Sequence, residues 1–246
     1  IVHIKVDTGM GRIGLREKEF LPFMEKVYKF GGIEIEGIFS HFANAENRDK
    51  SYSYYQLALF DKFLKSIENK IKIPLKHIAN SAGILNIPES YKNFDMVRIG
   101  LLLLGVYPAR YLSKIIKFEC AISCFTRVSF IKEVEKGVPL SYGLTFTTKR
   151  KTKVATCCIG YGDGLRRALS NKYFLKWKNE KLRIIGNICM DQTLIDATGK
   201  NVKVGDVIKV FGNDYGIEKM AEIVKTCPQE ILCGFGSKRI NKIYVK

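Results

Sequence analysis

Short apolar runs alternate with helical spacing through about residue 108, and this pattern predicts alternating β-strands and α-helices. We expect four such βα units. Their apolar runs are IVHIKV (1–6), IEIEGIFSHF (33–42), LKHIANSA (75–82) and MVRIGLLLLG (96–105). Residues 51–70 carry apolar side chains at helical spacing, at Leu57, Phe60, Phe63, Leu64 and Ile67. The pattern therefore predicts a parallel sheet with at least one helix buried against it.

From Lys117 onward the pattern changes to β-rich segments separated by turn residues such as Lys136-Gly137 and Thr198-Gly199. The predicted strands lie in residues 120–134, 151–160, 182–190, 192–197, 206–212 and 239–245. One helix, GIEKMAEIVKT (216–226), is predicted before the last of them. We expect two domains, an α/β domain over residues 1–113 and a mainly β domain over 114–246.

Composition restricts the class of protein. The chain has 246 residues, 46% of them hydrophobic, and is long enough to bury one large core or two smaller ones. Its longest apolar run, between Arg98 and Arg110, is too short to cross a bilayer, so a cytoplasmic protein without a membrane segment is expected. The chain opens inside a predicted strand, at Ile1, without the features of a signal peptide, so we expect a further segment upstream.

Cysteine and charge add little chemistry. The seven cysteines form no C-x-x-C pair and only three histidines are present, so we expect reduced thiols and no metal site. The formal net charge of +17 raises nucleic-acid binding as an alternative, with lysine-rich stretches at 147–153 and 176–183. The lysines are scattered and no recognition motif accompanies them, so we expect a solvated surface and no nucleic-acid partner.

Residues capable of chemistry follow the four predicted strands. They are Arg12, His41, Asn80-Ser81 and Arg98. In a parallel α/β barrel the carboxyl ends of the strands meet at one pocket, so these residues would converge there. A lone histidine is more often structural, and Ser81 could cap the next helix. Arg98 lies between Val97 and Ile99 in a run expected to be buried, and a buried cation needs a partner.

Seven motifs, in order and at similar spacings, make the chain resemble alanine racemase, a family that uses pyridoxal 5′-phosphate (PLP). They are KVDTGMGRIG, SHFANAE, ANSAG, DMVRIGLLLLGVYP, LSYGLTF, IGYGDG and GNICMDQ. The resemblance implies the second half of an eight-stranded (β/α) TIM-type barrel followed by a β domain. The family's PLP-binding lysine belongs to a motif like VKANAYGHG, which these 246 residues do not contain. We therefore expect a fragment, or one piece of a split enzyme, that is inactive alone.

The resemblance assigns catalytic roles to three residues. Tyr142 matches the second catalytic base, which the β domain of the neighbouring subunit contributes, so a homodimer with shared sites is expected. Arg98 matches the residue that faces the pyridine nitrogen of PLP, and His41 belongs to the network that links it to the tyrosine. A phenol has a pKa near ~10 and needs nearby cations to act as a base.

Further roles are implied for substrate and cofactor binding. Arg12 matches the residue that binds the substrate carboxylate, and Met190 one whose backbone N–H assists from the second subunit. Lys5 matches a lysine that is carbamylated in many relatives and orients Arg12; Asp7 is the alternative partner of Arg12. Ser81, Gly100, Leu101 and Lys238 match positions around the cofactor phosphate. Tyr161 and Arg167 resemble residues of the channel by which substrate enters, although Leu165 and Arg166 replace a common aromatic-proline pair there.

The expected function is interconversion of L-alanine and D-alanine by a two-base mechanism, which supplies D-alanine for peptidoglycan in the cell wall. Two alternatives remain open at this point. One is a racemase of serine or of broader specificity, and the other is a non-catalytic, truncated chain.

Overall fold

The structure is a computed structural model that describes residues 1–213 and 216–245. The chain divides into two compact units. Unit 1 comprises Ile1–Leu103 and Tyr107–Lys117, and unit 2 comprises Leu104–Val106 and Phe118–Lys246. The division lies a few residues from the predicted boundary, and the exact domain limits of 113 and 114 stay a prediction.

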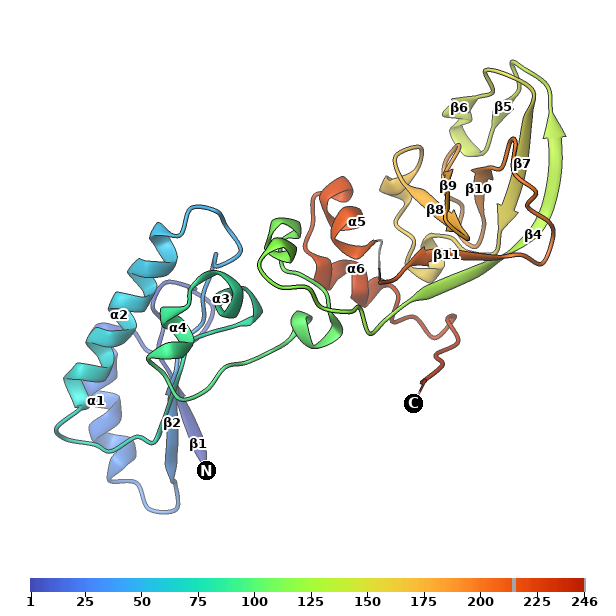
Figure 1. The fold of residues 1–246 in the computed structure, drawn as a ribbon. Coiled ribbons are helices and arrows are strands. Elements are labelled where there is room, and N and C mark those ends of the chain that lie inside the picture. The colour runs from blue at the N-terminus through green and yellow to red at the C-terminus, as the bar shows by residue number, and fades with distance from the viewer. Residues whose placement is uncertain (214–215, 246) are drawn as a thin grey trace. The chain divides into compact units, whose positions relative to one another are not determined.

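Unit 1 is built on a parallel three-stranded sheet in the order β1-β2-β3, with β1 at Val2–Lys5, β2 at Ile35–Phe39 and β3 at Leu75–His77. Two long helices, α1 (Glu17–Tyr28) and α2 (Ser51–Ile67), provide the crossovers. Figure 1 shows both helices on the same side of β1 and β2. The parallel sheet and its two crossover helices confirm the alternating βα order that the sequence pattern predicts, and the sheet is partly barrel-like.

The core of unit 1 forms where α2 lies on the sheet. The predicted helix over residues 51–70 is confirmed as α2, and its apolar stripe buries Leu57, Phe60, Phe63 and Ile67. The rings of Phe63 and Phe20, the latter from α1, meet edge to face with centroids 5.0 Å apart. Burying these side chains supplies most of the free energy that holds helices against a sheet.

The fourth predicted strand, at 96–105, is wrong. Along the line of β3, the described residues show a backbone hydrogen bond from Arg98 N to Ala79 O in this segment and one from Asp95 N to Lys76 O just before it. The segment then forms a 3-10 helix at Leu101–Leu104 instead of a strand. Short helices fill the rest of unit 1, at α3 (Ser81–Asn86), α4 (Glu89–Lys92) and a 3-10 helix at Arg110–Lys114.

Unit 2 contains a six-stranded antiparallel sheet in the order β10-β7-β4-β11-β8-β9. Its strands are β4 (Cys124–Val134), β7 (Thr152–Cys157), β8 (Phe174–Trp177), β9 (Glu180–Arg183), β10 (Thr193–Asp196) and β11 (Val207–Phe211). The longest, β4, pairs with β7 on one edge and with β11 on the other. A small hairpin of β5 (Pro139–Leu140) and β6 (Phe146–Thr147) and the helices α5 (Ile217–Val224) and α6 (Pro228–Gly234) complete the unit.

The predictions for unit 2 hold in part. Strands in 120–134, 151–160, 192–197 and 206–212 and the helix in 216–226 are confirmed. The predicted strand 182–190 covers only part of β9, because Gly186 N and Ile188 N donate to the side chains of Asn171 and Ser170 and not to a ladder. The last predicted strand, 239–245, is wrong: this segment has no sheet partner among the described residues, and Tyr244 is 90% exposed.

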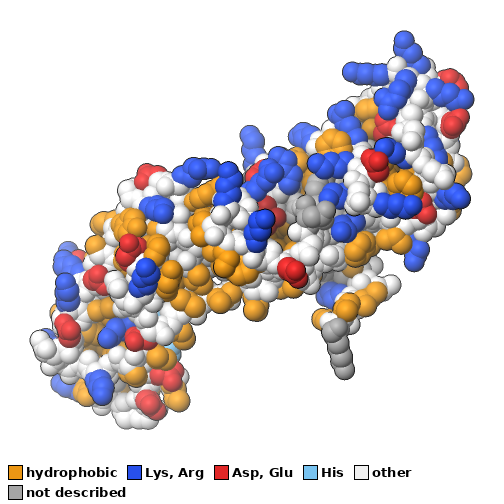
Figure 2. Space-filling view, viewed as in Figure 1, with side chains coloured by type: hydrophobic (Ala, Val, Ile, Leu, Met, Phe, Trp, Pro, Cys, Tyr) orange, Lys and Arg blue, Asp and Glu red, His pale blue; other side chains and the backbone are white. Residues whose placement is uncertain are grey.

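Basic side chains are spread over the surface, and the cysteines are unpaired. Lys and Arg side chains are spread over the visible face of each unit in Figure 2. Within the described residues, no helix combines the length and the apolar character that crossing a membrane requires. All seven cysteines are free thiols. Burial raises the pKa of Cys124 and of Cys157 to about 12, so both stay protonated in the sheet.

Candidate active site

The side chain of Arg98 is the centre of a polar cluster at the carboxyl ends of β2 and β3. Its Nη2 donates to Ser40 O at 2.8 Å and to Ile78 O at 3.3 Å, and lies 3.2 Å from His41 Nδ1. Its Nη1 hydrogen bonds to His77 Nδ1. The prediction that Arg98 has partners is confirmed, and the structure brings it together with His41.

Electrostatics determine how these histidines are protonated. Burial, together with the charge of Arg98, lowers the pKa of His41 and of His77 to about 4. Both imidazoles are therefore neutral near neutral pH, and each uses its Nδ1 lone pair to accept from Arg98. Burial also lowers the pKa of Arg98, but a guanidinium has donors only and stays charged.

The ring of Phe39, the last residue of β2, supports the cluster. It stacks on His77 with centroids 5.1 Å apart and an interplanar angle of 6°. Arg98 Cζ lies 5.2 Å and Lys5 Nζ 5.5 Å from the centroid of the same ring. Lys5 also donates to Val6 O at 3.2 Å, and burial lowers its pKa, partly offset by the charge of Asp7. The structure thus places two cations within cation–π distance of one aromatic ring.

The carboxylate of Asp7 holds the turn of the TGMGR loop that follows β1. Asp7 Oδ1 accepts from Gly9 N and Gly11 N, each at 3.0 Å, in a turn where both glycines have positive φ. Asp7 Oδ2 pairs with Arg16 Nε at 3.4 Å. The structure thus pairs Asp7 with Arg16, and the alternative in which Asp7 is the partner of Arg12 stays a prediction. Arg12 itself is exposed, and its charge contributes to the lowered pKa values of Lys5 and His41.

Ser81 and Gly100 meet beside the cluster. Ser81 Oγ accepts a hydrogen bond of 2.9 Å from Gly100 N. The cap of α3 is Asn80, whose side chain accepts from Gly83 N at 2.9 Å, so Ser81 is not the capping residue. Leu101, buried, begins the 3-10 helix that follows Gly100.

Tyr142 of unit 2 is held by a strained turn. Ser141 and Gly143, on either side, have φ of 64° and 69°, and Tyr142 O accepts from Asn187 Nδ2 at 2.7 Å. The side chain of Tyr142 is 74% exposed and lines a surface hollow of about 470 Å³. Its other lining residues are Ser141, Gly143, Leu144, Cys189, Gln192 and Leu194.

The segments carrying Tyr161 and Met190 lie side by side in unit 2. Tyr161 N donates to Cys189 O at 2.9 Å and Gly162 N to Met190 O at 2.8 Å. A Cβ at Gly160 would lie 2.3 Å from Cys189 O, so this contact requires glycine.

Arg167 and Lys238, the other two predicted residues of unit 2, are both exposed. Arg239, next to Lys238, is instead fixed by an ion pair from its Nε to Asp163 Oδ1 at 2.8 Å. Arg166 pairs with Glu230, and Leu165 is fully buried. The two residues that replace the aromatic-proline pair therefore have structural partners.

Sequence reasoning missed His77, His3 and Phe39. His77 lies directly at the end of β3, in the same class of position as His41 after β2, and that position was the available signal. His3 gave no signal, because a histidine in mid-strand is indistinguishable from any other polar residue without its neighbours.

The chain matches two family models, alanine racemase N-terminal domain over residues 1–108 and alanine racemase C-terminal domain over residues 121–244. The chain belongs to the alanine racemase family. The alanine racemase fold, an N-terminal domain followed by a C-terminal β domain, accounts for the order of its two units. Because the match covers residues 1–108, it does not bear on whether a lysine-bearing segment is missing.

Named relatives agree with this membership. Alanine racemase 2 of Caldanaerobacter subterraneus subsp. tengcongensis is 43% identical over 99% of this chain, and the chain covers 64% of that protein. The alanine racemase of Halothermothrix orenii is also 43% identical, with 99% of this chain and 65% of that protein covered. The chain thus spans slightly less than two thirds of the length of these curated relatives.

Solved alanine racemases share the fold. The enzyme from a D-cycloserine producing Streptomyces lavendulae superposes with a TM-score of 0.91 at 27% identity, covering 99% of this chain and 66% of that one. The Bartonella henselae enzyme, solved with covalently bound pyridoxal phosphate, gives 0.84 at 34% identity, covering 98% and 66%.

Proposed function

We propose that the protein containing this chain is an alanine racemase that interconverts L-alanine and D-alanine in the cytoplasm and supplies D-alanine for peptidoglycan. The observation that supports it best is the cluster in which neutral His41 and His77 accept from Arg98 at the carboxyl ends of β2 and β3. Because neutral acceptors fix the orientation of this cation, Arg98 is preorganised to interact electrostatically with a bound group.

The residues of unit 1 fit PLP by their donor chemistry. None of the contacts described for Arg98 uses its Nε–H, which remains able to donate to an acceptor such as a pyridine nitrogen. A small residue at Gly100 lets backbone N–H groups approach a phosphate, with Ser81 beside it. When bound, PLP supplies an electron sink that acidifies the α-proton of the amino acid.

Arg98 then controls what the cofactor can do. A guanidinium gives up no proton at working pH and has no lone pair to accept one, so it keeps a ring nitrogen opposite it unprotonated. With PLP bound, Arg98 in this position would favour rapid return of a proton to Cα over side reactions. His77, Ser40 and Ile78 fix the direction of the guanidinium, which keeps this contact in place.

Tyr142 Oη is proposed as the group that takes the α-proton of L-alanine, contributed by the β domain of a second subunit in a homodimer. Its 74% exposure leaves the phenol available to another chain. With His41 Nδ1 accepting from Arg98 at 3.2 Å, Nε2 carries the proton and can stabilise a phenolate; the 3.5 Å approach of Asn80 Nδ2 to Nε2 is then a contact and not a hydrogen bond. Met190, exposed at 54%, is proposed to offer its backbone N–H from the same subunit.

The remaining roles concern substrate access and binding. Arg12 is proposed to bind the substrate carboxylate. Lys5, whose pKa is lowered by burial, is proposed to react with carbon dioxide and become an anion that orients Arg12. Lys238 is proposed at the cofactor phosphate, with Leu101 N–H beside it, and Tyr161 and Arg167 at the channel by which substrate enters.

These 246 residues contain no motif like VKANAYGHG, so the PLP-bonding lysine is proposed to lie outside this chain. We therefore propose that this chain forms the second half of the barrel together with the β domain. In isolation it is expected not to racemise alanine.

Tyr142→Phe in the intact protein tests the proposal. The variant keeps the ring but loses the exchanging proton, so racemisation in both directions should fall by ~10²–10⁴-fold. Exchange of the α-proton in D₂O, followed separately for each enantiomer, should survive for D-alanine and nearly vanish for L-alanine. Tyr28→Phe, at an exposed tyrosine of α1, is the matched control. Equal residual exchange for both enantiomers would show that Tyr142 is not the L-face base.

A further inference from the structure

A row of hydrogen bonds continues behind Arg98 across the whole width of the three-stranded sheet. His77, on β3, meets Arg98 through Nδ1 and His3, on β1, through Nε2, with His77 Nε2 and His3 Nδ1 2.8 Å apart. His3 Nε2 is 2.9 Å from Glu36 Oε2. The exposed end of the row is Glu36, whose side chain is 43% exposed, against 24% for His3.

The two ends of this row determine the direction of every bond within it. The guanidinium of Arg98 can only donate, so His77 Nδ1 must accept. A neutral imidazole then carries its proton on Nε2, which donates to His3 Nδ1. His3 in turn carries its proton on Nε2 and donates to Glu36, whose carboxylate can only accept.

No other arrangement of protons satisfies all three bonds. If His3 were a cation, its Nδ1–H would meet the Nε2–H of His77 donor to donor. If His77 were a cation, its Nδ1–H would meet Arg98. The burial that lowers the pKa of His77 to about 4 acts in the same direction. The row therefore has one polarity, from the arginine to the carboxylate.

The fold makes room for this row specifically. His3 lies opposite Gly37 in the register of β1 and β2. A Cβ at position 37 would lie 2.4 Å from His3 Nδ1 and 2.5 Å from its Cε1. Gly37 has no positive φ, so its backbone conformation does not require glycine. Glycine is required there because any side chain would occupy the space of the His3 ring. The ring of Phe39 contacts both histidines of the row: it stacks on His77 and lies edge-on to His3.

We propose that Glu36 and His3 are positioning residues for Arg98: they hold His77 as its Nε2–H tautomer, so that its Nδ1 lone pair fixes the guanidinium. This role rests on the proposed function of Arg98, whereas the row itself does not. A carboxylate that accepts from one ring nitrogen of a histidine fixes its tautomer and raises the basicity of the other nitrogen. At metal-bound histidines the loss of such a partner typically costs about 10- to 100-fold in activity, and we take that range for the row behind Arg98.

The first experiment reads the row without using activity. In the intact protein labelled with ¹⁵N-histidine, NMR should show His77 protonated on Nε2, His3 unprotonated on Nδ1, and a scalar coupling between those two nitrogens across the hydrogen bond. Signals are assigned from the spectra of His77 and His3 variants. The opposite protonation pattern, or no coupling in the folded wild-type protein, would overturn the proposal.

The second experiment connects the row to turnover. His3→Leu removes the acceptor and should lower kcat for alanine racemisation by about 10- to 100-fold with little change in KM. His3→Asn places an amide oxygen near the former Nδ1 and should restore most of kcat. An unchanged kcat in His3→Leu, or no recovery in His3→Asn, would overturn the positioning role.

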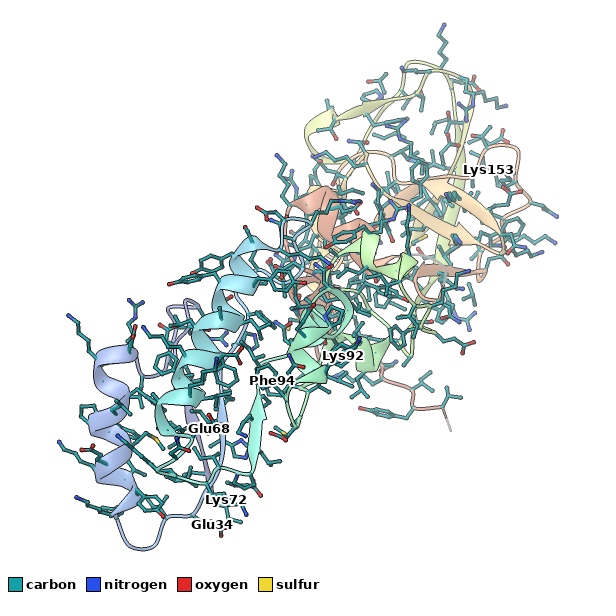
Figure 3. The ribbon with its side chains drawn as sticks, turned by 60° about the vertical axis from the view of Figure 1, so that its left-hand side comes forward. Glu34, Glu68, Lys72, Lys92, Phe94 and Lys153 are labelled. Atoms are coloured by element: carbon teal, nitrogen blue, oxygen red, sulfur yellow. The ribbon has the colours of Figure 1, made fainter. Side chains whose placement is uncertain are left out.

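The carboxylate has its own matched pair. Glu36→Gln should lower kcat, whereas Glu34→Gln should not. Glu34, labelled in Figure 3 where β2 begins, is exposed, and its side chain makes no hydrogen bond or ion pair with the residues that the structure describes; its backbone accepts from Val2 N. Equal effects of the two changes would refute a role for Glu36. If the wild-type protein does not racemise alanine, the proposed function fails, and the NMR result still decides whether the row exists.

Discussion

Replacing Gly37 by alanine should destabilise unit 1 out of proportion to the single methyl group it adds. The new Cβ would lie 2.4 Å from His3 Nδ1, whereas ordinary contact begins at 3.4 Å, so the ring must move by about 1.0 Å. That movement would stretch the 2.8 Å bond between His3 and His77 to as much as about 3.8 Å, beyond hydrogen-bonding range.

The cost follows from three contributions. Overpacking typically costs about 1–3 kcal/mol. The lost hydrogen bond between His3 and His77 costs about 1 kcal/mol more. Replacing glycine within a strand returns about 0.5–1 kcal/mol. The free energy of unfolding should therefore fall by about 1–3.5 kcal/mol, a decrease in Tm of roughly 2–14 °C at this chain length.

Urea unfolding followed by far-UV circular dichroism measures this change directly. Gly31→Ala is the matched control, because its Cβ would have no atom within 4 Å and its φ is not positive. It should alter stability by no more than about 0.5 kcal/mol. If Gly37→Ala proved as stable as Gly31→Ala, the His3 ring would not pack against Gly37. The position of His3 in the row of hydrogen bonds behind Arg98 would then be wrong.

Two further predictions concern unit 1. Because burial and Arg98 hold the pKa of His41 and His77 near 4, against 6.5 in the unfolded chain, the unfolded state binds more protons between these values. The free energy of unfolding should therefore fall as pH drops from 6.5 to 4, with a smaller slope in His77→Phe, measured by urea unfolding across that range; an equal slope would contradict the assignment. Phe60→Ala, at a fully buried ring, should cost about 3–5 kcal/mol, whereas Phe30→Ala, at a ring 65% exposed, should cost little; comparable losses would refute the core assignment.

The helix α2 could be predicted because its signal is local. An apolar stripe repeating every three to four residues marks the buried face without knowledge of any other segment. The run 96–105 has no such periodicity, and a continuous apolar stretch is compatible with a strand or with a buried turn. Only the tertiary structure shows that Leu103, 74% exposed, belongs to a 3-10 helix after Gly100.

The same distinction applies to the candidate site. Arg98 could be inferred because burying a cation among apolar neighbours is costly wherever it occurs. The link between His3 and His77 spans 74 residues and depends on the register of β1, β2 and β3. A shift of one residue in either pairing would turn these rings to opposite faces, and no local pattern specifies that register.

The position of β4 within the sheet of unit 2 has a consequence for synthesis. β4 ends at Val134, and its partner β11 begins at Val207, so 72 residues must be translated between them. At about 5–20 residues per second the ribosome takes roughly 4–14 s over this stretch. β7 is translated early and pairs with one edge of β4. The backbone groups of β4 that pair with β11 stay without their partner for the whole interval, next to the exposed rings of Phe125 and Phe130. Translational pauses within residues 135–206 are therefore the ones that prolong an open sheet edge on nascent chains, when neighbouring chains on one messenger could pair with it.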